Sequence, residues 1–131
     1  MAGCILISDT QMASRRMLRF ALQFKEAEIV ECAGADETRA LLETRPVELL
    51  LVGLYPREGD GFALLERLAT RSLPPALPVI LVGDTLLRAE YAARLWCGSA
   101  WLDRPFRVSE LLSLVDGIFS RPPAEWTKRP E

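Results

Sequence analysis

The sequence predicts an α/β domain in which a doubly wound parallel sheet of five strands is accompanied by five helices. Apolar runs of strand length alternate along the chain with longer segments of helical periodicity. Most of the strand-length runs are continuously apolar, as expected for strands buried on both faces. The length of 131 residues, 50% of them hydrophobic, suits a single core. We therefore expect one domain over residues 1–120 and a Pro-rich, charged tail or linker over residues 121–131.

The N-terminal quarter predicts a strand, a helix and an edge strand. Cys4–Ser8 (CILIS) is a short continuous apolar run and predicts a buried strand. Gln11–Lys25 has helical periodicity, and its predicted inward face includes Met17 and Phe24. The run Glu28–Cys32 is weaker and alternates between polar and apolar residues, which favours a strand at the edge of the sheet.

The middle of the chain repeats this alternation twice. A short helix is expected over Asp36–Thr44. Glu48–Val52 (ELLLV) is the most apolar run and predicts the strand at the centre of the sheet. After a loop rich in turn residues, Phe62–Thr70 predicts a third helix and Val79–Val82 a fourth strand.

The last two helices and the fifth strand complete the pattern. We expect Asp84 or Thr85 to cap a helix that runs to about Cys97. Ala100–Leu102 predicts the fifth strand, and Ser109–Phe119 has the apolar spacing of an amphipathic helix.

This order of elements implies a flavodoxin-like topology, because crossover connections between parallel strands are right-handed and consecutive strands pair or lie near each other. In such sheets, ligands bind and chemistry takes place at the carboxyl ends of the strands. The residues expected at those ends are Asp9, Thr10, Gly53, Gly83, Asp84, Asp103 and Arg104.

Composition narrows the function classes. The absence of His excludes His-based catalysis and His-ligated metal sites. The net charge of -2 disfavours direct binding of nucleic acid. Cys4, Cys32 and Cys97 are odd in number and widely spaced, which predicts reduced thiols in the cytoplasm and no disulfide framework. We find no targeting or membrane-spanning segment, and we expect no cofactor and no contact with membranes.

Motifs along residues 4–119 resemble the receiver domain of two-component response regulators. ILISD, with Arg15 and Leu18 after it, is similar to the family's first strand and helix. ELLLVG followed by Pro56 is similar to its third strand and loop. The segment that ends in Arg104-Pro105-Phe106 resembles its fifth strand, which ends in a basic residue, Pro and Phe.

The resemblance also shows departures from the family pattern. Family members accept a phosphoryl group on an aspartate at the end of strand three, where this sequence has Gly53, or Val52 in a register shifted by one. The acidic pair that holds Mg²⁺ in the family is reduced to Asp9 and Thr10. Gly83 replaces the strand-four Ser or Thr, and Arg104 replaces the strand-five Lys. The resemblance therefore implies a degenerate pseudo-receiver that is not an enzyme and binds Mg²⁺ weakly or not at all.

Two hypotheses about the degenerate pocket follow. Arg104 pairs with Asp9 or Asp84 and fills the vacated space, since a guanidinium makes a charge-assisted contact better than a point-like ammonium. Trp101 occupies the family's switch-aromatic position and packs permanently inward beside Gly83, because an unfilled gap forfeits dispersion contacts.

We predict that the domain works by protein–protein contact, with a partner or as a homodimer, in two-component or transcriptional regulation. Receivers commonly associate through the face built from helix four, strand five and helix five, and large exposed apolar patches mark interaction sites. The expected members of that face are Leu86, Leu87, Tyr91, Leu95, Trp96, Leu114 and Ile118.

Two alternatives stay open at this point. The first alternative is a receiver that is phosphorylated at an unorthodox acid, for which Glu58, Asp60 and Asp84 are candidates. Otherwise it is a flavodoxin-like binder of a small ligand at the turn Ser8–Ser14, although this turn has no Gly for close approach to a phosphate.

Overall fold

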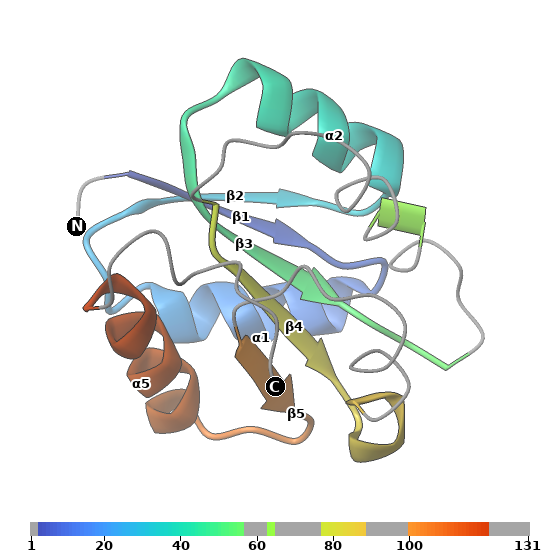
Figure 1. Ribbon diagram of the computed structural model, residues 1–131, viewed down its shortest axis with the longest axis vertical. Helices are drawn as coiled ribbons and strands as arrows, with labels where there is room; N and C mark the ends of the chain where they lie inside the picture. The colour runs from blue at the N-terminus through green and yellow to red at the C-terminus, as the bar shows by residue number, and fades with distance from the viewer. Residues whose placement is uncertain (1–2, 57–62, 65–76, 89–99, 121–131) are drawn as a thin grey trace.

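A computed structural model of the chain shows a parallel sheet with helices on both faces (Figure 1). It describes residues 3–56, 63–64, 77–88 and 100–120. The strands are β1 (Cys4–Ser8), β2 (Glu28–Cys32), β3 (Val47–Gly53), β4 (Val79–Gly83) and β5 (Ala100–Asp103). The named helices are α1 (Met12–Leu22), α2 (Ala35–Thr44) and α5 (Val108–Phe119). Residues 63–64 and 85–88 are also helical.

The strand order is β2-β1-β3-β4-β5, with all neighbouring pairs parallel. This is the order of the flavodoxin-like fold, as predicted. The strand predicted for the centre, β3, is the central strand, and the strand predicted for the edge, β2, is an edge strand. The predicted helix Phe62–Thr70, most of the helix from Asp84 to Cys97, and the tail 121–131 lie outside the described residues.

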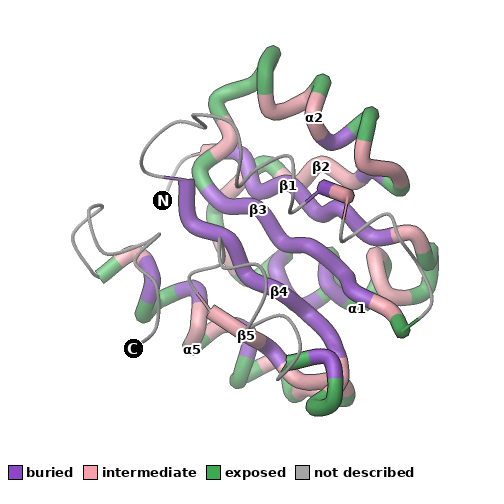
Figure 2. Tube along the Cα trace, turned by 45° about the vertical axis from the view of Figure 1, so that its right-hand side comes forward, coloured by how far each residue is buried: buried purple, intermediate pink, exposed green. Residues whose placement is uncertain are grey.

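Two apolar clusters hold the layers together. α1 and α5 cover one face of the sheet and α2 covers the other (Figure 1). The cluster beneath α1 and α5 contains Leu18, Leu51 and Val115, all almost completely buried. The opposite cluster contains Leu50 and Val52. Neighbouring β3 residues thus pack in different clusters, which explains the continuous apolar run and the buried strands in Figure 2.

The structure corrects the predicted interaction face. Leu87 and Ile118 are 5% and 1% exposed and belong to the two core clusters, so they are not available for docking. Ile118 lies seven residues after Leu111, which places both residues on the core side of α5. Leu86 is 86% exposed and Leu114 is half-buried. The three remaining predicted members, Tyr91, Leu95 and Trp96, lie outside the described residues.

The predicted inward face of α1 is also partly wrong. Leu18, Ala21 and Leu22 are completely buried, but Met17 and Phe24 are 60% and 63% exposed. Successive residues turn by about 100° around a helix, so neighbours of buried positions point away from the core. Met17 thus lies on α1 away from the core, whereas Phe24 lies beyond the end of the helix at Leu22.

None of the helices in the described ranges has the length and apolar character needed to cross a lipid bilayer.

Candidate functional site

The carboxyl ends of the strands bring three of the predicted pocket residues together, Asp9, Gly53 and Arg104. Asp9 follows β1, Gly53 and Gly83 end β3 and β4, and Arg104 follows β5. A Cβ atom built on Gly53 would overlap the Asp9 carboxylate and lie 3.0 Å from Arg104 Nη2. Asp9 and Arg104 therefore occupy the space into which a side chain at position 53 would project.

Asp9 has a completely buried carboxylate that accepts hydrogen bonds from several donors. Its Oδ1 accepts from the Gln11 backbone N–H at 2.9 Å and from the Tyr55 hydroxyl at 2.6 Å. Its Oδ2 accepts from the Ser14 hydroxyl at 2.6 Å and from Arg104 Nη2 at 3.2 Å. Each carboxylate oxygen therefore has two donors, which compensates for the removal of this charge from water.

Arg104 is held by contacts on several sides. Besides the ion pair with Asp9, its Nη1 donates to the Leu54 carbonyl at 2.8 Å. The guanidinium carbon lies 4.2 Å from the centre of the Tyr55 ring, a cation–π contact. The predicted pairing of Arg104 with Asp9 is confirmed. Asp84 has another role: its Oδ1 accepts from the Leu87 backbone N–H at 2.9 Å and caps the helix that begins at residue 85, as predicted.

The geometry resolves the register at the end of β3. Val52 packs in the cluster on the opposite face of the sheet, whereas the Cβ direction of Gly53 points to Asp9 and Arg104. Gly53 is thus the residue that faces the pocket, and it carries no side chain that could attack phosphorus.

Two residues that the sequence analysis did not select complete the network, Tyr55 and Ser14. Burial, reinforced by the hydrogen bond that the phenol donates to Asp9, raises the pKa of Tyr55 from 10.0 to about 12. The phenol is therefore a proton donor throughout the physiological range. Tyr55 lies two residues beyond β3 in a loop, and no spacing or motif in the sequence links it to Asp9.

The donor set does not fit Mg²⁺, which prefers an octahedron of oxygen ligands that includes carboxylates. Both Asp9 oxygens are engaged by hydrogen-bond donors, and the neighbouring Thr10 brings no second acid. In the part of the chain that the structure describes, no three His, Cys, Asp or Glu residues cluster as metal ligands would. The Arg104 guanidinium instead supplies the positive charge next to Asp9.

Comparisons with known proteins agree with this fold. No known protein-family profile matches the chain. The uncharacterised 14.6 kDa protein of the sodA1 3' region in Leptolyngbya boryana is 30% identical over 112 residues, covering 85% of this chain and 86% of that protein. The chemotaxis response regulator CheY4 of Vibrio cholerae superimposes with a TM-score of 0.76 at 17% identity, covering 90% of this chain and 99% of that chain.

Two longer regulators match as well. The KDP operon transcriptional regulatory protein KdpE of Escherichia coli is 32% identical over 110 residues, which cover 82% of this chain and 47% of KdpE. The regulatory protein VirG of Rhizobium rhizogenes is 25% identical over 126 residues, covering 95% of this chain and 52% of VirG. The chain thus spans about half the length of these two relatives. The chain has the receiver (CheY-like) fold of response regulators.

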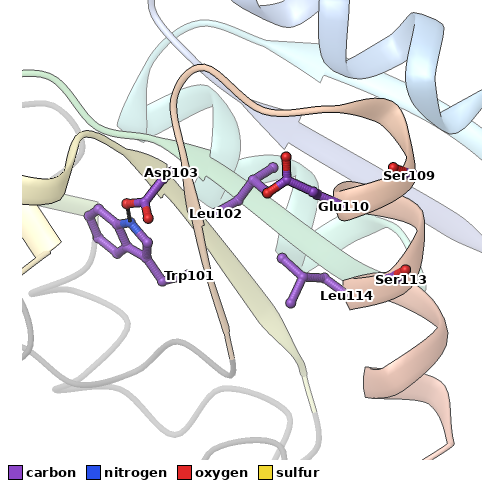
Figure 3. A pocket seen from close by; sticks show the side chains of 7 residues that line it. All are labelled: Trp101, Leu102, Asp103, Ser109, Glu110, Ser113 and Leu114. Atoms are coloured by element: carbon purple, nitrogen blue, oxygen red, sulfur yellow. Dashed lines mark hydrogen bonds between the residues drawn. The ribbon is translucent and has the colours of Figure 1, made fainter.

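In this receiver domain, Trp101 lies against the end of β4. Its Cη2 and Cζ2 atoms would each be 3.1 Å from a Cβ atom at Gly83, so the indole fills the space above that glycine. Its Nε1 donates to Asp103 Oδ1 at 2.7 Å (Figure 3). Trp101 also packs on the core cluster that contains Leu81. The predicted inward packing of Trp101 is confirmed.

A groove of about 360 Å³ separates β5 from α5 in the receiver domain (Figure 3). Its walls carry both polar and apolar groups, and Leu114 supplies an apolar side chain from α5. The lining residues are Trp101, Leu102, Asp103, Ser109, Glu110, Ser113 and Leu114.

Proposed function

We propose that this receiver domain is a pseudo-receiver, a cytoplasmic signalling module that acts by protein–protein contact without being phosphorylated. The observation that carries the proposal is the overlap between a side chain at position 53 and the Asp9–Arg104 ion pair. The space that a phosphoacceptor would need is filled by the Asp9–Arg104 ion pair, and the residue at that position is glycine.

The chemistry of phosphoryl transfer supports the same proposal. Transfer requires an in-line nucleophile together with cations that neutralise the developing charge. Gly53 removes the nucleophile, and the hydrogen bonds around Asp9 leave no free carboxylate oxygen for a metal ion. Asp84, one of the alternative acceptors, is engaged as a helix cap.

The proposal includes a fixed output conformation. A receiver that switches needs its strand-five aromatic to exchange between two positions. Trp101 is held in one position by two contacts. Its indole ring fills the space over Gly83, and its Nε1 donates to the Asp103 carboxylate. Leaving this position would open a gap at Gly83 and break a hydrogen bond, each of which costs free energy. We propose that the domain therefore presents one surface constantly.

We place the contact surface on the face that includes Leu86 and Leu114. Leu86 is 86% exposed, and Leu114 borders the groove between β5 and α5. The relative KdpE is named as a transcriptional regulatory protein, which makes regulation of transcription the process we propose for the protein that contains this domain. Either a partner protein or a second copy would cover this face.

The decisive experiment is incubation of the full chain with acetyl phosphate and Mg²⁺, followed by intact-mass spectrometry. We expect no phosphoryl adduct under conditions that label a phosphorylatable receiver in the same tube. A stable adduct that maps to Glu58, Asp60 or Asp84 would overturn the proposal in favour of phosphorylation at an unorthodox acid.

Self-association through the proposed face is tested by light scattering during size-exclusion chromatography. We expect Leu86→Glu and Leu114→Glu each to shift the chain toward monomer, because burying an unpaired carboxylate in an interface is unfavourable. Ala40→Glu, at an exposed position on α2 outside the proposed contact face, is the matched control. Equal elution of all three variants and the wild type as dimers would refute the proposed face.

A further inference from the structure

A pocket of about 380 Å³ lies beside Arg104, outside the proposed contact face. Three segments that are far apart in the chain form it: the first turns of α1, the loop after β3 and the segment after β5. Its lining is mostly apolar, and the polar groups include Arg104 and Tyr55. Pockets of this size and character are typical of small-molecule sites. The apolar residues of the lining are Ala13, Met17, Pro105 and Phe106.

The volume of the pocket suits a ligand with two or three fused rings. A cavity of about 150 Å³ holds a single benzene ring, and this pocket is more than twice as large. Phe106 offers an aromatic ring and Met17 an adaptable thioether, and both groups pack well against flat aromatic molecules. Met17 is 60% exposed, so the pocket is open to solvent. A ligand can therefore enter without a rearrangement of the core.

Arg104 keeps hydrogen-bond donors that its protein contacts do not use. A guanidinium has five N–H groups. Among the described residues, three acceptors engage it: the Leu54 carbonyl at 2.8 Å, Asp9 Oδ2 at 3.2 Å and Ser14 Oγ at 3.5 Å. Its Nε is buried and has no acceptor in the same part of the chain. At least two N–H groups are thus left for an acceptor atom that a ligand brings.

A negative charge on the ligand is unfavourable in this pocket. Arg104 is the one charged residue among the described residues that line it, and it is already paired with the buried Asp9 carboxylate. The hydroxyls of Tyr55 and Ser14 donate to Asp9, so both present acceptor oxygens to a ligand. An anion would face these oxygens and the Asp9 charge without gaining a new cation. The pocket therefore favours an uncharged ligand.

We propose that this pocket binds a small, flat, uncharged aromatic molecule that carries a carbonyl oxygen. The rings pack against Met17 and Phe106, and the oxygen accepts from Arg104. This ligand class differs from a phosphate, which the acidic turn around Asp9 disfavours. The proposal goes beyond the proposed function and is independent of it, because binding here needs neither a phosphoacceptor nor the face at Leu86 and Leu114.

The first test is a titration of the full chain with quinolin-2-one, an uncharged bicyclic molecule with one carbonyl group. The readout is the NMR methyl signals of the methionines. Met17 lines the pocket, whereas Met12 is exposed on the same helix and does not line it. We expect the Met17 signal to shift and saturate while the Met12 signal moves much less. The absence of a saturable Met17 shift would overturn the proposal, and so would equal shifts of both signals.

A pair of matched variants locates the binding site by isothermal titration calorimetry. Met17→Glu and Met12→Glu each place a carboxylate at an exposed position of α1, so both are expected to keep the fold. We expect Met17→Glu to raise the Kd of quinolin-2-one about tenfold, because it adds a charge to an apolar wall of the pocket. Met12→Glu should leave the Kd unchanged. Equal affinities of the two variants would place the probe elsewhere and overturn the proposal.

A second probe tests the charge of the ligand. Quinoline-2-carboxylate has the same two rings but carries a negative charge, and we expect its Kd to be about tenfold higher than that of quinolin-2-one. Equal or tighter binding of the carboxylate would overturn the assignment of an uncharged ligand. A Met17 signal that shifts with protein concentration in the absence of any probe would assign the pocket to a second copy of the chain instead, and would equally overturn the proposal.

Discussion

Asp9 and Arg104 have different roles in their ion pair: Asp9 is the buried charge, and Arg104 makes the contacts that only a guanidinium can make. The Asp9 carboxylate is removed from water, and three neutral donors share its stabilisation with Arg104. Arg104 uses different edges of its guanidinium for Asp9 and for the Leu54 carbonyl, and its plane contacts Tyr55. A lysine ammonium lacks that planar geometry and would not make all three contacts at once.

Gly53 is required because that space is occupied, which predicts the effect of adding a side chain there. We expect Gly53→Ala to lower the free energy of unfolding by about 1–3 kcal/mol through overpacking. Gly53→Asp should cost more, because it adds a second carboxylate beside Asp9. Urea denaturation monitored by circular dichroism measures both changes. If Gly53→Asp were as stable as the wild type and became phosphorylated by acetyl phosphate, the pocket would have to be open.

The phenol of Tyr55 predicts how stability depends on alkaline pH. Its pKa in the folded chain is about 12, against 10.0 for the unperturbed group, mainly because of burial and then because of the hydrogen bond to Asp9. Its contribution to stability is fully present below pH 10. It declines as pH rises from 10 toward 12, since the unfolded chain loses its proton first.

We therefore expect Tyr55→Phe to flatten the loss of stability above pH 10. At pH 7 the same variant should be less stable by about 1 kcal/mol, because the Asp9 carboxylate loses one donor. Urea denaturation across this pH range checks both statements. An identical alkaline slope in the variant and the wild type would show that other groups cause the decline.

Some contacts of the pocket could be predicted from the sequence and others could not, depending on the kind of contact. The pairing of Arg104 with Asp9 was predictable, because both residues follow strands whose carboxyl ends share one edge. Tyr55 and Ser14 were not, since their roles arise from side-chain directions within loops and first turns. The register at Gly53 also needed the structure, because a shift by one residue turns the side chain to the other face.

At the scale of elements, the strands were the best predicted features. All five predicted strands are present; β3 is longer than predicted by two residues, and β4 and β5 are longer by one residue each. Their continuous apolar runs leave little ambiguity. The predicted bounds of α2 and α5 agree with the structure within one residue, whereas α1 ends three residues earlier than predicted. The assignment of helix faces was incomplete, as Met17, Phe24 and Ile118 show. A helix flanked by another helix has two apolar sides, and spacing alone does not tell the buried side from the uncovered one.

Replacing Gly117 in α5 should raise the free energy of unfolding, whereas replacing Gly53 should lower it. A Cβ atom at Gly117 would have nothing within 4 Å, and the residue is exposed in the last turns of the helix. We expect Gly117→Ala to raise the free energy of unfolding by about 0.5–1 kcal/mol, because alanine is the better helix former. Thermal denaturation measures the change. A loss of stability would mean that this helix does not have its described form in solution.

For the whole molecule, the strand order decides which residues meet. The order β2-β1-β3-β4-β5 places the end of β1 beside the end of β3 and brings both near the segment after β5. Residues 9, 53 and 104 thereby come together although they are far apart in the chain. The order was predictable from general rules of chain crossover, and so was the meeting of these residues.

The last prediction concerns the response of the whole domain to Mg²⁺. An ion that binds only the folded chain at a hundred times its Kd stabilises it by about 2.7 kcal/mol. For a domain of this size, that would raise Tm by roughly 10 °C. Because hydrogen-bond donors engage both Asp9 oxygens, we expect the Tm of the wild type to match that in a control salt of equal ionic strength.

Two substitutions made together should create the response. Thr10→Asp supplies a second carboxylate, and Arg104→Ala removes the guanidinium that neutralises Asp9. We expect the double variant to be less stable without Mg²⁺, because two acids then repel each other, and to gain several degrees in Tm when Mg²⁺ is added. Thr10→Asp alone should gain little while Arg104 still occupies the pocket. A clear Mg²⁺ response of the wild type would contradict the view that the ion pair has taken the place of the metal.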